Sequence, residues 1–105
     1  PKNIEIIEGN FIKYDKKSLY LDKYQLKFPL KIRKWNKGDY IYPTAMNGKK
    51  LVSKIFKDKK LSLYDKATQW ILEDNEHILW VIGIRFDKRK YMKANSNFKI
   101  SLIEN

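Results

Sequence analysis

The sequence predicts a small, layered α+β domain in which mostly antiparallel strands surround a short central pair of helices. Apolar and charged residues alternate in short segments toward both ends of the chain, which is typical of strands with one buried face. Between these segments the apolar spacing changes to that of a helix. The length of 105 residues suits one domain, and 43% hydrophobic and 14% aromatic residues are enough to form a small core.

The N-terminal segments are predicted to be strands. Apolar and charged residues alternate in residues 4–6 and 12–14. Gly9 and Asn10 lie between these segments and are typical turn residues. Residues 18–21 form a further candidate strand.

A longer alternating segment follows in residues 26–33, where apolar side chains are expected to face a core and Lys and Arg the opposite side. The predicted core-facing set is Leu26, Phe28, Leu30 and Ile32. Pro29 has no backbone donor, which favours an edge position or a bulge. A turn is expected at residues 36–39 and a short strand at residues 40–42, followed by a loop over residues 43–50.

The middle of the chain is predicted to be helical. Its apolar residues have the spacing of an amphipathic helix of about two turns. These residues are Leu51, Val52, Ile55 and Phe56, and the other face carries Lys50, Lys54 and Lys57. Ser62 is a candidate N-cap for a second short helix that runs through Thr68.

The C-terminal segments predict a hairpin and a closing strand. Residues 70–73 and 78–82 are the two arms, and the polar residues 74–76 are the tip. The second arm is apolar throughout and ends at Gly83, which is typical of a central, buried strand. Residues 98–103 alternate again and are expected to close the same sheet. Core positions are also predicted for Trp35, Trp70 and Trp80.

Groups that could support catalysis or hold a metal are scarce. The chain has no Cys, which excludes disulfides, thiolate metal sites and a Cys nucleophile, and fits a reducing cytosol. His77 is the only His, and no phosphate-binding glycine motif is present. We interpret His77 as a solvated turn residue, and likewise the acidic residues of the hairpin tip, Glu73, Asp74 and Glu76. No catalytic residue and no metal site is predicted.

Positive charge is concentrated in residues 28–60. This stretch has ten Lys or Arg and two acidic residues, a net charge of +8 out of +11 for the whole chain. A concentrated cationic surface that contains aromatic residues is typical of proteins that bind polyanions. The longest apolar run, residues 78–84, is much shorter than the ~20 residues needed to span a bilayer. We therefore expect a nucleic-acid partner, no membrane and a cytoplasmic location.

Several motifs follow one another in this region. RKWNKGD occupies residues 33–39, PTAM residues 43–46, GKKLVS residues 48–53 and ILWVIGIR residues 78–85, with Arg89 close behind. In order and spacing they resemble the C-terminal domain of tRNA(Ile)-lysidine synthetases, whose signatures include I-R-x-W-x-x-G-D and I-x-W-V-x-G-x-R. The resemblance covers about residues 19–103, and about residues 1–18 lie outside it.

Four positions depart from the pattern of that family. Ala45 stands where Gly is usual, and Ser62 where the family has Pro. Trp70 replaces another Pro. Lys66 replaces an Arg, which keeps the charge but loses the bidentate fork of a guanidinium.

The resemblance implies the fold and the activity of a longer parent enzyme. The family domain is a small layered β/α fold, and a related fold occurs in the β subunit of phenylalanyl-tRNA synthetase. The parent enzymes use ATP, with magnesium, and lysine to convert the wobble cytidine of isoleucine tRNA to lysidine. Their adenylating site lies in an N-terminal catalytic domain. Because this chain begins with Pro1 rather than Met, we expect a missing part upstream. Residues 1–105 would then be a single C-terminal domain that grips tRNA on its acceptor-stem side.

Phosphate contacts are the predicted role of the basic residues. Proteins grip duplex RNA by its phosphates, 2′-hydroxyls and shape, and such contacts carry little sequence information. A strand face with Lys31 and Arg33 and the lysine face of the predicted helix could follow two phosphate ridges. Trp35 could stack on a base, although a core position is the favoured interpretation. The predicted RNA-binding residues are Arg33, Lys34, Lys37, Lys49, Lys50, Lys54, Lys57, Lys60, Lys66, Arg85 and Arg89.

Two other functions stay open. The chain could be a module that docks on its own catalytic domain or forms a homodimer, with an incidental basic face, which predicts an exposed apolar patch. It could also be an accessory domain of an aminoacyl-tRNA synthetase, although the motifs of residues 33–53 argue against this. For any single Lys a solvated surface position is as expected as an RNA contact, whereas the cluster favours RNA binding.

Overall fold

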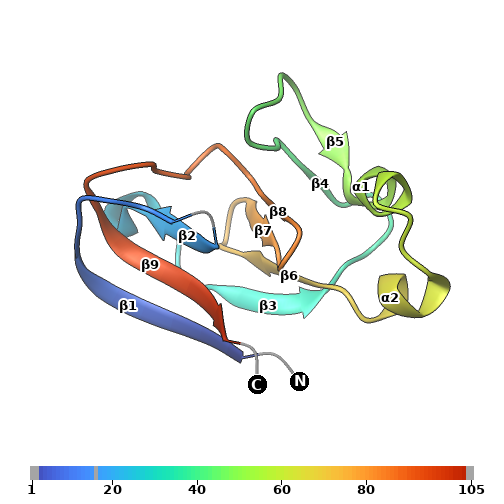
Figure 1. Ribbon diagram of the computed structural model, residues 1–105, viewed down its shortest axis with the longest axis horizontal. Coiled ribbons are helices and arrows are strands. Elements are labelled where there is room, and N and C mark those ends of the chain that lie inside the picture. Colours follow the sequence, from blue (N-terminus) through green and yellow to red (C-terminus); the bar gives the residue numbers. More distant parts are fainter. Residues whose placement is uncertain (1–2, 16, 104–105) are drawn as a thin grey trace. The chain divides into compact units, whose positions relative to one another are not determined.

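A computed structural model describes residues 3–15 and 17–103. Contacts divide the chain into two units, residues 1–26 with 90–105 and residues 27–89. Strands dominate both units, and the two α-helices of the described residues belong to the second (Figure 1). The predicted α+β class, with mostly antiparallel strands and a short central helix pair, is confirmed. Across the described residues, no helix combines the length and hydrophobicity that crossing a membrane requires.

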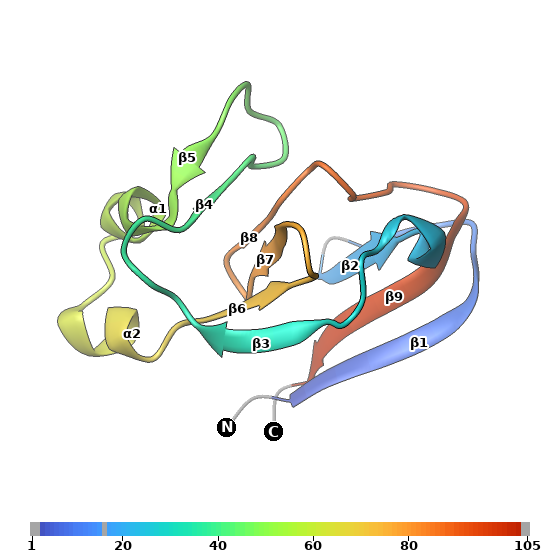
Figure 2. The same ribbon diagram turned by 180° about the vertical axis from the view of Figure 1, so that it is seen from behind.

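A three-stranded antiparallel sheet forms the first unit. β9 (Ser96–Ile103) lies between β1 (Asn3–Phe11) and β2 (Ser18–Leu21). β1 and β9 run side by side in both views (Figures 1 and 2). A short 3-10 helix, η1 (Lys23–Gln25), follows β2. Alternate side chains at the start of β9 are buried, as the period of a strand predicts, and these are Ser96, Phe98 and Ile100.

Three predictions for this unit are wrong: the turn at Gly9 and Asn10, the strand over residues 12–14, and the sheet to which the C-terminal strand belongs. Gly9 and Asn10 do not form a turn, because β1 continues through them and a register shift between Glu8 and Phe11 absorbs the irregularity. Residues 12–14 consequently lie beyond the strand. The C-terminal strand, predicted to close the sheet of the hairpin, instead joins β1 and β2. Its alternating pattern identifies a strand with one buried face, but it does not specify which strands lie beside it.

A four-stranded antiparallel sheet underlies the second unit. Its order is β3 (Lys31–Lys34), β6 (Trp70–Glu73), β7 (Ile78–Val81) and β8 (Arg85–Phe86). The predicted hairpin of β6 and β7 is confirmed, and β7 is an inner strand whose residues are all buried. β3 is an edge strand, in agreement with the position of Pro29 just before it.

A short ribbon and the two α-helices complete this unit. β4 (Tyr40–Ile41) pairs with β5 (Lys50–Leu51), which leads directly into α1 (Val52–Asp58). α2 (Leu63–Ala67) begins at the predicted N-cap, because Ser62 Oγ accepts a hydrogen bond from the backbone of Asp65 at 3.1 Å. The apolar face of α1 packs with strand residues in one core cluster, formed by Ile41, Val52, Ile55, Phe56, Ile71, Ile78 and Val81.

The three tryptophans occupy different environments. Trp80 is buried, and Trp35 packs edge-on against Phe56 beside the core cluster with ring centroids 5.0 Å apart, so both are core residues as predicted. Trp70 is 45% exposed, so its predicted core position is wrong. It lies at the start of β6, opposite the last residue of the edge strand β3, where few neighbours can cover a large ring.

The predicted facing of residues 26–33 is wrong in part, although Leu26 is buried as predicted. Phe28 and Ile32 are 54% and 49% exposed. The regular strand begins only at Lys31, so the residues before it do not share its alternation. Arg33 lies opposite the buried Ile71, and cross-strand partners share a face. The face of β3 on the core side therefore carries an arginine, and the next section describes its partners.

Candidate nucleic-acid interface

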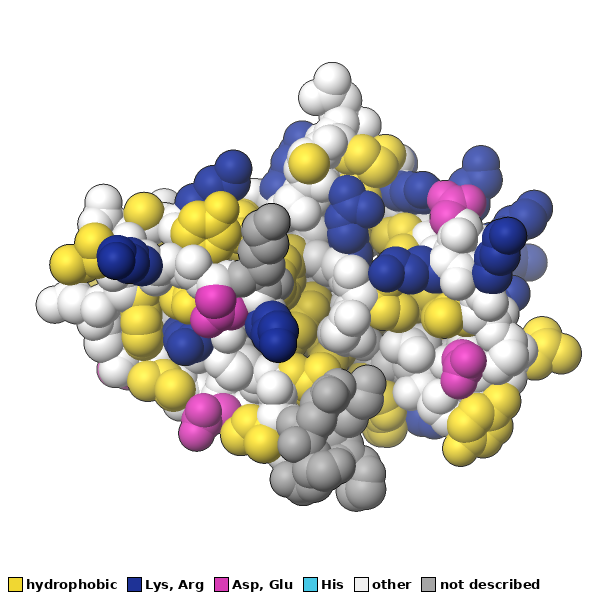
Figure 3. Space-filling model, in the orientation of Figure 1, with side chains coloured by type: hydrophobic (Ala, Val, Ile, Leu, Met, Phe, Trp, Pro, Cys, Tyr) yellow, Lys and Arg dark blue, Asp and Glu magenta, His cyan; other side chains and the backbone are white. Residues whose placement is uncertain are grey.

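All of the predicted RNA-binding residues belong to the second unit. They come from β3 and the turn after it, the β4–β5 ribbon, both helices with the segment between them, and the segment from β8 to Arg89. In the space-filling view, Lys and Arg side chains gather over the β4–β5 ribbon and α1 (Figure 3). The fold of this unit therefore collects cations from segments that are separated in the sequence.

Four of the predicted lysines are available to bind an anion. Lys37, Lys54, Lys57 and Lys60 are exposed, and their side chains form no hydrogen bond or ion pair with any described residue. Lys54 and Lys57 are neighbours on the solvent face of α1, since residues three apart lie together on a helix and its other face is in the core. A ligand could reach these ammonium groups without breaking an internal contact.

Lys50 and Lys66 already have roles within the unit. Lys50 pairs with Asp58 across the ends of α1, and this hydrogen bond lowers the pKa of the Asp58 carboxyl below its ordinary value. Lys66 is half-buried, and its backbone carbonyl accepts the indole N–H of Trp35 at 2.6 Å. Both lysines thus help to hold the helices in place.

Two of the predicted RNA-binding lysines lie over aromatic rings. The ammonium group of Lys49 is 4.6 Å from the ring centroid of Tyr40, and that of Lys34 is 5.2 Å from the ring of Trp70. Lys34 also donates to the backbone carbonyl of Ala67 at 3.1 Å. Such cation–π contacts at exposed sites are weak, about 0.5–1 kcal/mol, so both ammonium groups remain accessible to a stronger anion.

Arg33 is the centre of an ion-pair network inside the unit. Its two terminal nitrogens donate to the two carboxylate oxygens of Asp39, each at 3.0 Å, and its Nε donates to Glu73 at 3.2 Å. The hydrogen bond to Asp39 is the main cause that raises the pKa of Arg33. Burial acts to raise the pKa of Asp39, but hydrogen bonds from Arg33 and the Asn36 amide hold it below the ordinary value. The network ties the turn before β4 to the sheet.

The other two arginines are also engaged. Arg89 donates from Nε and Nη2 to Asp87, whose side chain is 1% exposed, and its Nη1 lies 2.9 Å from Nδ1 of His77. Burial acts to lower the pKa of Arg89, but the hydrogen bonds that Arg89 donates to Asp87, together with the nearby charge of Asp87, outweigh it, so the pKa is raised. Arg85 donates to the carbonyl of Thr44 at 2.6 Å. Within this unit the three arginines position loops, whereas the free cations are lysines.

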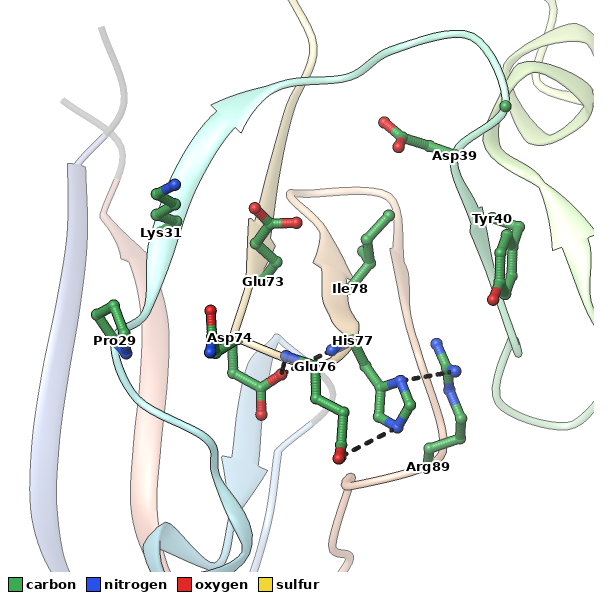
Figure 4. A pocket seen from close by; sticks show the side chains of 12 residues that line it. Pro29, Lys31, Asp39, Tyr40, Glu73, Asp74, Glu76, His77, Ile78 and Arg89 are labelled. Atoms are coloured by element: carbon green, nitrogen blue, oxygen red, sulfur yellow. Dashed lines mark hydrogen bonds and ion pairs between the residues drawn. The ribbon is translucent and has the colours of Figure 1, made fainter.

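A pocket of about 310 Å³ lies among the same residues (Figure 4). It is bounded by the start of β3, the tip of the β6–β7 hairpin, the turn before β4 and Arg89. Its lining residues are Pro29, Lys31, Gly38, Asp39, Tyr40, Glu73, Asp74, Asn75, Glu76, His77, Ile78 and Arg89.

The hairpin tip is not a solvated turn. Asp74 is 4% exposed, and its carboxylate accepts backbone N–H groups of Lys27, Glu76 and His77 at 2.9, 2.8 and 2.7 Å. His77 is half-buried and contacts Arg89 as described above. The solvated interpretation is therefore wrong for Asp74, Glu73 and His77, because the tip folds against the segment that precedes β3. Glu76 is exposed, as predicted.

Sequence reasoning did not find this pocket. Its walls come from four separate segments, none of which carries a binding motif. The described residues contain no group of three or more His, Asp or Glu side chains that could hold a metal ion. Of the pocket walls, the sequence predicted only the turn at Gly38. Gly38 has a φ of 97°, which is readily available to glycine.

Comparison with known proteins identifies the family. The family model of the TilS substrate C-terminal domain matches residues 30–102. The chain belongs to this family. The resemblance found in the motifs is therefore confirmed. The match to the TilS substrate C-terminal domain includes nearly all of the second unit and most of β9.

Relatives of known name support this family assignment. The tRNA(Ile)-lysidine synthase of Parabacteroides distasonis is 41% identical over 78 residues, which are 74% of this chain and 18% of that protein. The tRNA(Ile)-lysidine synthase of Bacteroides thetaiotaomicron is 39% identical over 75 residues, 71% of this chain and 18% of that protein. The chain thus spans less than a fifth of the length of these relatives.

A solved structure supports the fold. The crystal structure of a TilS C-terminal domain superposes with a TM-score of 0.77 over 96% of this chain and 79% of that one, at 23% sequence identity. The superposition includes the first unit, most of which the family model does not match. The strand arrangement described above is therefore that of the TilS C-terminal domain fold.

Proposed function

We propose that this chain is the tRNA-gripping C-terminal part of a tRNA(Ile)-lysidine synthase. The parent enzyme would use ATP, with magnesium, and lysine to convert the wobble cytidine of isoleucine tRNA to lysidine in the cytoplasm. Its catalytic domain would lie outside these 105 residues, and this part would hold the acceptor-stem side of the tRNA.

The observation that supports this function best is the set of free lysines in the second unit. The ammonium groups of Lys37, Lys54, Lys57 and Lys60 form no hydrogen bond or ion pair with the described residues. We assign them the main phosphate contacts, with Lys34 and Lys49 beside them. Arg33, Arg85, Arg89 and Lys50 would act mainly by holding the surface in shape, because their side chains already serve internal contacts. Lys66 contacts Trp35 only through its backbone carbonyl, so its side chain would add to the phosphate contacts.

A second candidate function is docking. Leu63 and Tyr64 at the start of α2 are 85% and 76% exposed, which is unusual for large apolar side chains that have no partner. Hydrophobic side chains protrude over α2 (Figure 3). This surface would suit the catalytic domain of the same protein or a second copy of the chain.

Equilibrium binding across a salt series tests the proposal. The chain is titrated with an isoleucine tRNA transcript and with an unrelated tRNA. Each phosphate contact contributes about 0.7–0.9 to the slope of log affinity against log salt. Changing Lys54, Lys57 and Lys60 together to Glu should weaken binding strongly and reduce this slope by about 2–3. Equal binding of both tRNAs would mean that selectivity lies elsewhere in the enzyme.

The matched control changes three exposed lysines of the first unit, Lys13, Lys17 and Lys93, to Glu. It alters the net charge by the same amount, so any general charge effect appears in both variants. Equal losses in the two variants would contradict a defined lysine surface. The absence of tRNA binding even at low salt would favour the docking function.

A further inference from the structure

The pocket of the second unit is acidic although the unit as a whole is basic. Its lining includes the carboxylates of Asp39, Glu73, Asp74 and Glu76 but only two cations, Lys31 and Arg89. A phosphate group is therefore a poor occupant. A ligand rich in hydrogen-bond donors suits the lining better, because carboxylates only accept hydrogen bonds when ionised.

Most of the polar groups in the wall are already occupied. Both oxygens of Asp39 accept from Arg33, the carboxylate of Asp74 accepts three backbone amides, and Arg89 is held by Asp87 and His77. These contacts make the wall rigid. They also leave few groups that can turn toward a ligand.

Two charged groups of opposite sign, Glu73 and Lys31, remain on neighbouring strands. One oxygen of Glu73 accepts the Nε–H of Arg33 at 3.2 Å, and the other accepts no hydrogen bond from a described residue. Lys31 lies directly opposite Glu73 in the β3–β6 ladder, yet its ammonium group forms no hydrogen bond or ion pair within the described residues. Figure 4 shows both side chains at the pocket, with the Tyr40 ring on the opposite side. The site thus offers a carboxylate, a neighbouring ammonium and an aromatic ring.

This combination matches the base of guanosine. Guanine presents two adjacent donors, N1–H and the N2 amino group, which fit the two oxygens of one carboxylate, while Lys is a common partner of its O6 and N7 acceptors. Adenine and cytosine place a ring acceptor beside their amino group, which a carboxylate repels. Uracil has a single donor between two carbonyl groups. The pocket volume of about 310 Å³ is at the small end for ligand sites and suits a single base.

We propose that this pocket binds the base of an unpaired guanosine of an RNA ligand, with Glu73 on its N1 and N2 donors, Lys31 on its acceptors and Tyr40 beside its ring. This inference rests on the proposed RNA-binding function and adds a nucleotide class to it. The flanking phosphates would remain outside the acidic pocket. Lys49, whose ammonium lies over Tyr40, and Lys37, which precedes the lining residue Gly38, are placed to receive them.

Titration of the ¹⁵N-labelled chain with the four nucleoside 5′-monophosphates tests the pocket directly. All four carry the same phosphate, so differences between them report on the base. GMP should shift the amide signals of Glu73 and of the turn at Gly38–Tyr40, with at least ten times the affinity of AMP, CMP or UMP. Equal shifts with all four nucleotides, or no shift at the pocket with GMP, would overturn the proposal.

Two variants separate recognition from folding. Lys31→Met removes the ammonium without touching the Arg33 network, and Glu73→Gln removes the charge that faces the N1 and N2 donors. Each should lower GMP affinity about tenfold or more, while Glu5→Gln, an exposed residue of β1, should leave it unchanged. Unfolding curves show whether a loss of GMP affinity in Glu73→Gln comes from lower stability, caused by the lost hydrogen bond to Arg33. An unchanged GMP affinity in Lys31→Met would overturn the assignment.

The same proteins are then tested with RNA hairpins that end in a single unpaired G or U. The G-ended hairpin should bind more tightly, and Lys31→Met and Glu73→Gln should each reduce the difference. If tRNA binds with a steep salt dependence but neither the terminal base nor the variants matter, the guanine pocket is refuted and the phosphate grip stands. If GMP binds but no RNA does, the pocket stands and the proposed function fails.

Discussion

The Arg33–Asp39 pair should contribute measurably to stability, and Asp39→Asn tests this. The carboxylate of Asp39 accepts two hydrogen bonds from Arg33 and one from the Asn36 amide. An Asn side chain keeps one acceptor oxygen but turns an NH₂ group toward the guanidinium, so at least one charged hydrogen bond is lost. Hydrogen bonds to charged groups contribute about 1.5–3 kcal/mol. Because the Arg33 side chain is 30% exposed, we take a value toward the lower end, about 2 kcal/mol.

The effect should depend on pH in a defined direction. The pKa of Asp39 is lowered in the folded protein, so its contribution is complete above the ordinary pKa of 3.8 and is lost as the pH falls through the folded value. Urea unfolding followed by tryptophan fluorescence measures the free energy of unfolding of both proteins from neutral pH into the acid range. The difference between wild type and Asp39→Asn should be largest at neutral pH and should shrink below about pH 4.

A matched control is available in α2. Asp65→Asn makes the same chemical change at an exposed carboxylate that forms no side-chain hydrogen bond with a described residue, so it should change stability by less than about 0.5 kcal/mol. A variant Asp39→Asn that is as stable as wild type at neutral pH would refute the reasoning. So would a loss of stability that stays constant down to acid pH, because such a loss would not come from the charge of Asp39.

Three further predictions concern stability, each measured by thermal or urea unfolding. Ala45 has a φ of 62°, a left-handed conformation that costs a residue with a Cβ about 1–2 kcal/mol. Ala45→Gly should therefore stabilise the chain. A loss of stability would show that the Ala45 methyl makes a contact worth more than this conformational cost. Phe56→Ala should cost about 3–5 kcal/mol because Phe56 is fully buried, whereas Trp70→Ala at a half-exposed position should cost much less; similar losses would contradict the burial described. Ser62→Ala should cost about 1 kcal/mol and speed amide hydrogen exchange at Asp65, whose N–H the Ser62 hydroxyl accepts, and unchanged exchange would exclude the cap.

Ala45 and Ser62 also show what the departures from the family pattern mean. Ala45 occupies a left-handed position that suits the Gly usual in the family. Ser62 stands where the family has Pro and instead begins α2 through its side chain. Nothing in the structure explains why Trp70 replaces a Pro. Lys66 contributes its backbone carbonyl to Trp35, an interaction that an Arg would make equally well.

The features that the sequence predicted correctly depend on short stretches of chain. The helix at Val52 with Lys54 and Lys57 on its solvent face, the cap at Ser62 and the hairpin of β6 and β7 all follow from residues within a few positions of one another. Lys50 and Leu51, predicted to belong to this helix, instead form β5, and Leu51 is exposed. Local spacing is enough for such elements, because a helix face or a pair of neighbouring strands is set by the period of the apolar residues. The family motifs and the concentration of positive charge could also be recognised in the sequence, because each depends on residues that are close together in the chain.

The features that the sequence could not provide depend on pairing between distant segments. The place of β9 between β1 and β2, the exposure of Ile32 and Trp70, and the use of Arg33 as an internal partner of Asp39 and Glu73 were all unexpected. A strand pattern indicates that one face is buried but not which segment covers it, and a cation in a sequence does not reveal whether a carboxylate will fold beside it. The acidic pocket belongs to this class, since its lining exists only once four separate segments have met.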